Sequence, residues 1–267
     1  MPKDFYSDVL SRVGIAHDAS VLVICGGPYD RQTFFEQGFT AVTISNLDHH
    51  DRVESNYAPY TWVRQDAENL TFADDAYDWV VVNAGLHHCG SPHRALCEML
   101  RVARKGVLVL EARDSFLMRI AVRLGLTVQH ELEPTALSGA SSKTSFGGYR
   151  NGFIPNYIYR WTERDVEKTV NSFLPQYQHT CQFFYGLRLP LQRLAMSKNQ
   201  LVHISIHVVG ALAWLFRTVM PKQGNLFAFA ASKRGKVQPW LCETPDGFEI
   251  NKTYMDDRFS PEKYRKP

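Results

Sequence analysis

The sequence lacks the features of a secreted, disulfide-linked or nucleic-acid-binding protein. Its five cysteines are odd in number and form no C-x-x-C pair, so neither a disulfide framework nor a zinc ribbon is expected. The opening MPKDFYSDVL has no apolar signal segment. The 30 basic and 27 acidic residues give a net charge of +3, too balanced for a basic nucleic-acid-binding face. We therefore expect a cytoplasmic protein with no nucleic-acid partner.

What the chain does contain is an ordinary globular composition. Of its 267 residues, 45% are hydrophobic, and they are spread over most of the length. A chain of this size can bury roughly 70–75% of its unfolded surface, which is enough for one large core. Extensive disorder is excluded.

Strand-like and helix-like segments alternate in the first half. Short apolar or β-branched runs predict strands at Val21–Cys25, Thr40–Ser45, Trp62–Arg64, Tyr77–Asn83 and Val107–Glu111. Helical spacing predicts helices at Asp4–Val13, Arg31–Gly38 and Ser91–Ala103. This order is typical of an α/β fold with a mostly parallel sheet and helices on both faces.

The second half is less regular. Thr162-Glu163-Arg164-Asp165 is a capping-box start for a further helix, and Tyr177–Phe184 and Asn225–Ala231 resemble two late strands. The long loop 129–161 is typical of a lid or binding loop. We expect one domain over 1–231, with a helical insertion at 185–222, followed by a polar tail at 232–267.

Polar groups and glycines follow the early strands, at the edge where ligands bind in open α/β sheets. The first strand ends in Cys25-Gly26-Gly27, which allows a ligand to approach the backbone closely. The second leads to Asn46 and Asp48, candidates for ribose hydroxyls. The third leads to Asp66 and Ala67, whose carboxylate and backbone N–H could serve an adenine ring, and the fourth ends at Asn83.

The order of these segments resembles the class I S-adenosylmethionine-dependent methyltransferases, in the methyltransferase type 11-like branch that reads D-x-x-x-L-x-F…FD-x-V…LHH…P-x-x-AL-x-E-x-x-RV…KGG-x-L. The matching residues are Asp66, Leu70, Phe72, Tyr77-Asp78, Val80, Leu86-His87-His88, Pro92, Ala95-Leu96, Glu98, Arg101-Val102 and Lys105-Gly106. The resemblance implies a Rossmann-like seven-stranded sheet whose last strand is antiparallel. It also implies S-adenosyl-L-methionine as the cofactor.

The chain departs from this family in its first turn. The acidic residue usual in the first strand is replaced by Val23, and only Gly27 matches the G-x-G-x-G loop. The ribose-binding acid falls on Asn46, which hydrogen-bonds a hydroxyl without charge assistance. Asp30 is a candidate substitute for the missing acid near the methionine moiety.

The resemblance implies methyl transfer, and His87 and His88 are the candidate bases because they follow the fourth strand. Glu111 and Asp114 are the next candidates. No ligand spacing in the sequence indicates a metal, although His87, His88 and Glu111 carry ligand atoms.

The acceptor is expected to be a small molecule, polar or sugar-like, bound by the loop that contains Tyr149, Arg150, Asn151 and Tyr157. Residues 201–220 form the most apolar segment. A packed helix, a homodimer contact and an in-plane membrane contact, serving a lipid-linked acceptor, are the interpretations open for it.

Two other functions stay open at this stage. A non-catalytic methyltransferase-like protein would explain the altered glycine loop. A short-chain dehydrogenase would explain Asn83-Ala84-Gly85, but its glycine turn and its Y-x-x-x-K pair do not occur, since Trp161 stands four residues after Tyr157.

Overall fold

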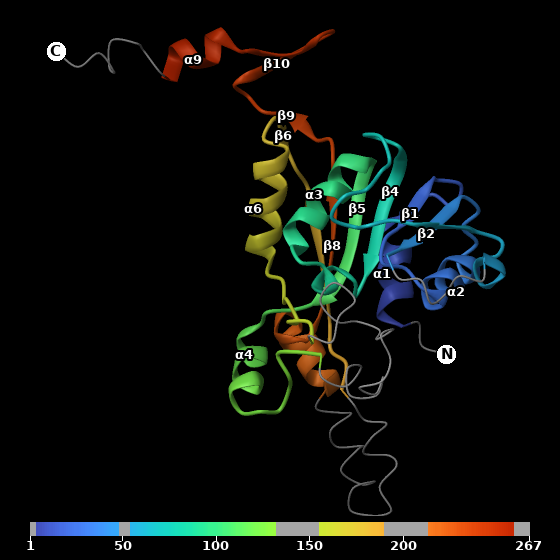
Figure 1. Ribbon diagram of the computed structural model, residues 1–267. Coiled ribbons are helices and arrows are strands. Elements are labelled where there is room, and N and C mark those ends of the chain that lie inside the picture. The colour runs from blue at the N-terminus through green and yellow to red at the C-terminus, as the bar shows by residue number, and fades with distance from the viewer. Residues whose placement is uncertain (1–3, 48–53, 132–154, 190–212, 259–267) are drawn as a thin grey trace, which may run out of the picture.

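A seven-stranded sheet forms the centre of the protein in the computed structural model, which describes residues 4–47, 54–131, 155–189 and 213–258 (Figure 1). The strand order is β3-β2-β1-β4-β5-β8-β7. The strands are β1 (Val21–Val23), β2 (Val42–Asn46), β3 (Thr61–Arg64), β4 (Tyr77–Asn83), β5 (Ala103–Ala112), β7 (Cys181–Gly186) and β8 (Leu226–Ser232). Strands β1 to β5 pair in parallel, and β8 is antiparallel to both neighbours. The expected α/β sheet with an antiparallel last strand is confirmed.

Helices cover both faces of this sheet (Figure 1). The helices of the described ranges include α1 (Phe5–Val13), α2 (Pro28–Glu36), α3 (Pro92–Val102), α4 (Phe116–Arg123), α6 (Glu163–Phe173) and α9 (Lys252–Arg258). Short 3-10 turns are η1 (Glu54–Tyr57), η2 (Leu86–His88) and η4 (Pro221–Gln223). One apolar cluster joins α3 and α6 to the sheet, and a second joins α1 and α2 to its other face.

The central strands supply both clusters by simple alternation. In β4, Val80 and Val82 belong to the α3 side, while Val81 between them belongs to the α1 side. All three are fully buried. A strand that is covered on both faces needs apolar residues on both sides, which is why the centre of β4, Val80–Val82, is a continuous β-branched run.

Local caps decide where the helices begin. In α6 the hydroxyl of Thr162 accepts from the backbone N–H of Asp165, whose carboxylate accepts from the N–H of Thr162, as the capping box predicted. Helix α2 starts at Pro28, three residues earlier than expected, because proline suits the first helical position and Asp30 accepts a hydrogen bond from the Gly27 N–H at 2.9 Å.

The late part of the chain differs from the prediction in two places. The single strand expected over Tyr177–Phe184 is two, because β6 (Tyr177–Gln178) leaves the sheet and pairs with β9 (Lys236–Val237). The expected polar tail contains β9, a hairpin of β10 (Leu241–Thr244) and β11 (Gly247–Ile250), and α9. These last elements lie at the far end of the molecule from α4 (Figure 1).

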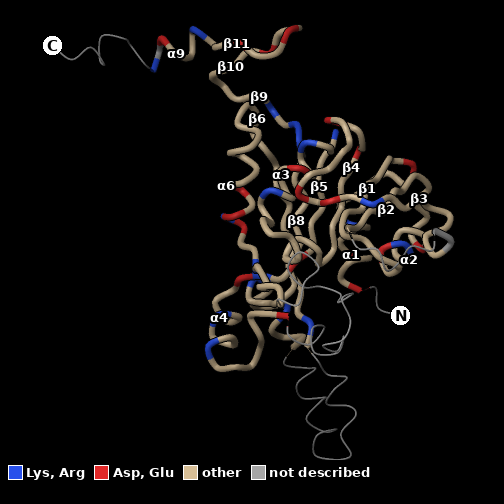
Figure 2. The backbone as a smooth tube through the Cα atoms, in the orientation of Figure 1, with Lys and Arg blue, Asp and Glu red and all other residues tan. Residues whose placement is uncertain are grey.

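The sequence predicted no nucleic-acid partner and left a membrane contact open. Figure 2 shows basic and acidic residues interspersed along the described chain. No helix in the described ranges combines the length and the apolar character needed to cross a bilayer. Most of the apolar segment 201–220, with its expected dimer or membrane contact, lies outside the described residues; 213–219 are helical.

Candidate active site

Tight turns end β1 and β4 side by side at the carboxyl edge of the sheet. Cys25 and Ala84, just after these strands, both adopt a left-handed backbone with φ of 51°. This conformation is costly for residues other than glycine and is concentrated at functional sites. The two turns touch, since a Cβ on Gly85 would lie 2.5 Å from the Cβ of Cys25.

The two glycines of the first turn meet different surroundings. A Cβ on Gly26 would lie 2.8 Å from the Cγ2 of Ile44, so the packing of β1 against β2 requires glycine there. A Cβ on Gly27 would have nothing within 4 Å. Gly27 therefore leaves open space beside the backbone, in front of the start of α2, which suits close approach by a ligand.

Asn46 and Asp66 continue the same edge. The Asn46 side-chain amide donates to the carbonyl oxygen of Gly26 at 3.3 Å, which ties the end of β2 to the glycine turn. The Gln65 N–H donates to the Asn46 carbonyl oxygen, so β3 ends beside it. Asp66 is exposed, and its carboxylate accepts from the Glu68 N–H at 2.9 Å. Ala67 is buried, Asn83 is half-buried at the end of β4, and Asp48 lies outside the described residues.

Asp30 has a different setting from the other candidates. Its side chain is 6% exposed and caps α2 through Gly27. Burial raises the pKa of this carboxyl to about 6, although the Gly27 hydrogen bond acts in the opposite direction. The buried Asp30 side chain therefore stabilises the first turn by accepting the hydrogen bond from the Gly27 N–H.

The histidines predicted as bases form a compact cluster. The Nδ1 of His87 lies 2.8 Å from Oε2 of Glu111, and its Nε2 lies 3.3 Å from Oε1 of Glu131. The Nε2 of His88 lies 3.7 Å from Oε2 of Glu131, and its Nδ1 contacts the side-chain amide of Asn156. The two imidazole rings are 4.3 Å apart. Helical turn η2 places both rings at the end of β4, as the motif suggested.

The two histidines differ in their electrostatic surroundings. Burial lowers the pKa of His87, but the facing carboxylates of Glu111 and Glu131 outweigh it and raise that pKa to about 10. The hydrogen bond from His87 in turn lowers the pKa of Glu131. A base must be neutral, and the prediction of His87 as a base assumed an ordinary histidine pKa. The structure differs because two carboxylates flank the ring. His88 has a side chain that is 35% exposed and reaches solvent.

A cavity of about 390 Å³ opens beyond β5 and contains one of the predicted acceptor residues. Tyr157 and Tyr159 line it together with Arg119, Arg160 and Asp114. The Arg119 guanidinium pairs with Asp114 at 2.8 Å. The other predicted acceptor residues, Tyr149, Arg150 and Asn151, lie outside the described residues. Asn156 and Tyr159 belong to the same predicted acceptor loop, whereas the sequence predicted no role for Glu131.

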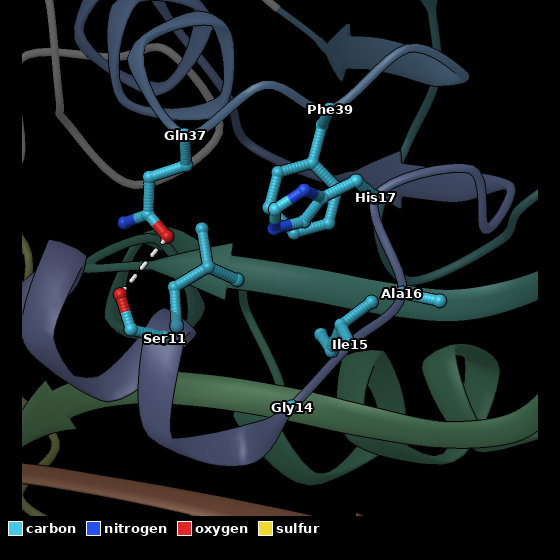
Figure 3. Close-up of a pocket in the computed structure, with 8 residues that line it drawn as sticks. Ser11, Gly14, Ile15, Ala16, His17, Gln37 and Phe39 are labelled. Carbon is cyan, nitrogen blue, oxygen red and sulfur yellow. Dashed lines mark hydrogen bonds between the residues drawn. The ribbon is translucent and has the colours of Figure 1, made fainter.

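A second cavity lies on the opposite edge of the sheet (Figure 3). It measures about 400 Å³ and is lined by residues that precede β1 and β2, among them Gly14, His17, Gln37 and Phe39. Figure 3 shows the hydrogen bond between two of its lining residues, which Ser11 donates to Gln37 at 3.2 Å. Since it opens at the amino ends of the strands, it is separate from the site above.

Comparison with known proteins points to one family. Residues 25–110 match the family model of a methyltransferase domain. A demethylmenaquinone methyltransferase from Clavibacter sepedonicus is 27% identical over 157 residues, 58% of this chain and 58% of that protein. A protein of the same name from Renibacterium salmoninarum is 30% identical over 104 residues, 39% of this chain and 43% of that protein. The chain therefore spans less than two thirds of these relatives.

Solved structures agree on the fold. The YcgJ protein from Bacillus subtilis superposes with a TM-score of 0.51 at 12% identity, over 85% of this chain and 97% of that one. At this identity the likeness concerns the architecture alone.

Proposed function

We propose that this chain, which carries a class I methyltransferase domain, transfers a methyl group from S-adenosylmethionine to a small acceptor. The observation that carries the proposal is the convergence of Gly27, Asn46 and Asp66 on one sheet edge within residues 25–110, the range that matches the methyltransferase domain. The same edge continues to the histidines after β4.

The residues of this edge fit the cofactor. Gly27 leaves free space beside its backbone, and Asn46 and the exposed Asp66 offer polar atoms to ribose hydroxyls and to the adenine amine. When bound, the cofactor supplies a methyl group activated on a sulfonium. The protein then has to orient the acceptor atom in line with that methyl group and to accept the proton that the acceptor loses.

His88 is the proposed proton acceptor for a hydroxyl. His87 has both nitrogens facing carboxylates and a side chain that is only 7% exposed. The His88 side chain is 35% exposed, with Nε2 3.7 Å from Glu131 and Nδ1 beside the Asn156 amide. In the proposed step the acceptor oxygen bonds to the methyl carbon as the carbon–sulfur bond breaks, and that bond's electron pair stays on sulfur. The hydroxyl proton passes to His88, and Glu131 stabilises the resulting imidazolium.

The cavity beyond β5 is the proposed acceptor pocket. The rings of Tyr157 and Tyr159 offer flat apolar surface, and Arg119 and Arg160 offer hydrogen bonds to hydroxyls or to an anion. This combination supports O-methylation of a polar or sugar-like molecule, including one linked to a lipid.

A second candidate is methylation of a ring carbon next to a phenolic hydroxyl. The curated relatives carry the name demethylmenaquinone methyltransferase, and the aromatic wall of the cavity suits a planar ring. His88 would again accept the phenolic proton. The two candidate reactions use the same cofactor edge and differ in the atom that is methylated.

Calorimetric titration of the full chain with S-adenosylmethionine and S-adenosylhomocysteine tests the cofactor. Transfer of labelled methyl is then measured over a panel of sugars, phenols and naphthols. His88→Gln should keep cofactor affinity and lose transfer, while His17→Gln, at the opposite sheet edge, should change neither. Absence of cofactor binding would reject the proposal. Binding without transfer to any acceptor would favour a non-catalytic protein.

A further inference from the structure

We infer that His87, His88 and Glu131 form a binding site for a divalent transition-metal ion. The two imidazole Nε2 atoms and the Glu131 carboxylate turn toward one another, and one ligand atom from each residue lies within 4.8 Å of the others. The contributing residues come from η2 and from position 131, which are distant in the sequence. The inference concerns the acceptor end of the proposed active site, and only its catalytic consequence rests on the proposed function.

The distances are close to those of a metal-ligand set. Metal–nitrogen and metal–oxygen bonds of about 2.0–2.2 Å, at angles between octahedral and tetrahedral, separate neighbouring ligand atoms by about 3.0–3.5 Å. The Nε2 of His87 is 3.3 Å from Glu131 Oε1, and the Nε2 of His88 is 3.7 Å from Glu131 Oε2. A small rotation of the two partly exposed side chains would close the set around one ion.

The second ring nitrogen of each imidazole, Nδ1, also has a neighbouring side chain. The Nδ1 of His87 faces Glu111 Oε2 at 2.8 Å, and Glu111 Oε1 accepts from the Leu86 N–H at 2.6 Å. The Nδ1 of His88 contacts the amide of Asn156. Ligand histidines in metalloproteins almost always bind a carboxylate, carbonyl or water through their second nitrogen, which sets the ring orientation. Here His87 has such a partner in Glu111, and both rings present Nε2 to the same carboxylate. At His88 the group nearest Nδ1 is the amide nitrogen of Asn156, so metal binding through Nε2 would require that amide to turn its oxygen toward the ring.

The donor set indicates which ions fit. Two imidazoles and one carboxylate suit Zn²⁺, Mn²⁺ or Fe²⁺, whereas Mg²⁺ and Ca²⁺ prefer all-oxygen sites. His87 is buried, but His88 and Glu131 have side chains 35% and 24% exposed. A site with three protein ligands and an accessible side keeps positions for water or for an acceptor oxygen.

A bound ion would change the proton step proposed above. Both Nε2 atoms become ligands, so His88 serves as the proton acceptor only in the metal-free protein. In the loaded protein the acceptor oxygen would bind the ion, which lowers the pKa of its hydroxyl, and the proton would leave to solvent. This favours acceptors whose reacting group is an oxygen or lies next to one.

Metal titration of the full, chelator-stripped chain tests the site without cofactor or acceptor. We expect one Zn²⁺ or Mn²⁺ per chain by calorimetry, and little response to Mg²⁺. His88→Gln and Glu131→Gln should weaken binding at least tenfold, and Glu111→Gln about 10–100-fold through the orientation of His87. The exposed His17→Gln is the matched control and should bind as the wild type does.

Two results would overturn the inference: no stoichiometric binding of either ion, or binding that survives both His88→Gln and Glu131→Gln. Circular dichroism of each variant separates loss of the site from loss of the fold, and the absorption spectrum of Co²⁺ substituted into the wild type reports its coordination directly. If S-adenosylmethionine binds while no metal does, only this inference fails. If a metal binds and the cofactor does not, the proposed function fails instead.

Discussion

Replacing Asp30 by asparagine should stabilise the protein near neutral pH. The carboxyl is buried and caps α2 through the Gly27 N–H. Its burial raises the pKa from 3.8 to about 6. Asparagine has the same shape and can still accept that hydrogen bond through its side-chain oxygen, but it has no charge to desolvate.

The magnitude follows from linkage between protonation and folding. Because the folded-state pKa is raised, the folded protein keeps a proton that the unfolded chain loses between about pH 4 and pH 6, so stability falls as pH rises through this window. A shift of about two units corresponds to about 3 kcal/mol at neutral pH. Asparagine loses the favourable interaction of a charge with the start of α2, worth about 0.3–1 kcal/mol, so the net gain should be about 2 kcal/mol.

Urea denaturation between about pH 4 and pH 8 measures the effect. The free energies of unfolding of wild type and Asp30→Asn should converge at the acid end and separate as pH rises, with the variant more stable. Asp78→Asn is the matched control. Asp78 accepts from Arg104 and from the Ser20 N–H, and its pKa is lowered because these bonds outweigh burial, so asparagine there should destabilise the protein at neutral pH. If Asp30→Asn is less stable than wild type at pH 7, the burial argument is wrong.

Five further substitutions test the sheet edge. Gly27→Ala should leave the melting temperature unchanged but weaken cofactor binding measured by calorimetry, since its Cβ meets no protein atom. Asn46→Asp should weaken cofactor binding in the same titration, because a carboxylate cannot donate to the Gly26 carbonyl oxygen, which the Asn46 amide contacts at 3.3 Å beside the glycine turn. Asp66→Ala should weaken it by about 1–3 kcal/mol, and unchanged affinity would remove Asp66 from the site. Gly85→Ala should lower the melting temperature, and Cys25→Gly should partly restore it, since the new methyl group clashes with the Cys25 side chain.

The fold was largely predictable because its signals are local. Strand β4 has the predicted bounds, since a run of buried β-branched residues reports a strand covered on both faces. The division of Tyr177–Phe184 into two strands depends on distant contacts. His179, between β6 and β7, places Nε2 2.7 Å from the Leu174 carbonyl oxygen and Nδ1 3.0 Å from that of Ser232. No local sequence pattern predicts these two contacts of His179.

The site was predictable only where residues follow a strand directly. The glycine turn, Asn46, Asp66 and the two histidines meet this condition. Glu131 lies 44 residues from His87, and Asn156 lies 68 residues from His88. Both lie in irregular chain whose course is set by tertiary packing, so sequence spacing says nothing about their approach. The raised pKa of His87 comes mainly from Glu111 in β5 and only secondly from Glu131, so the irregular chain accounts for the smaller part of it.

The contact between Cys25 and Gly85 packs the two halves of the candidate site against each other. Gly85 directly precedes η2, which carries both histidines, and Cys25 directly precedes the glycines of the first turn. Because a Cβ on Gly85 would come within 2.5 Å of the Cβ of Cys25, no side chain fits between the first turn and the histidine turn. On the proposed function, a cofactor bound at the glycine turn would therefore lie against the turn that carries His87 and His88. The left-handed Cys25, packed against Gly85, would supply this contact although the turn retains only one glycine of the family pattern.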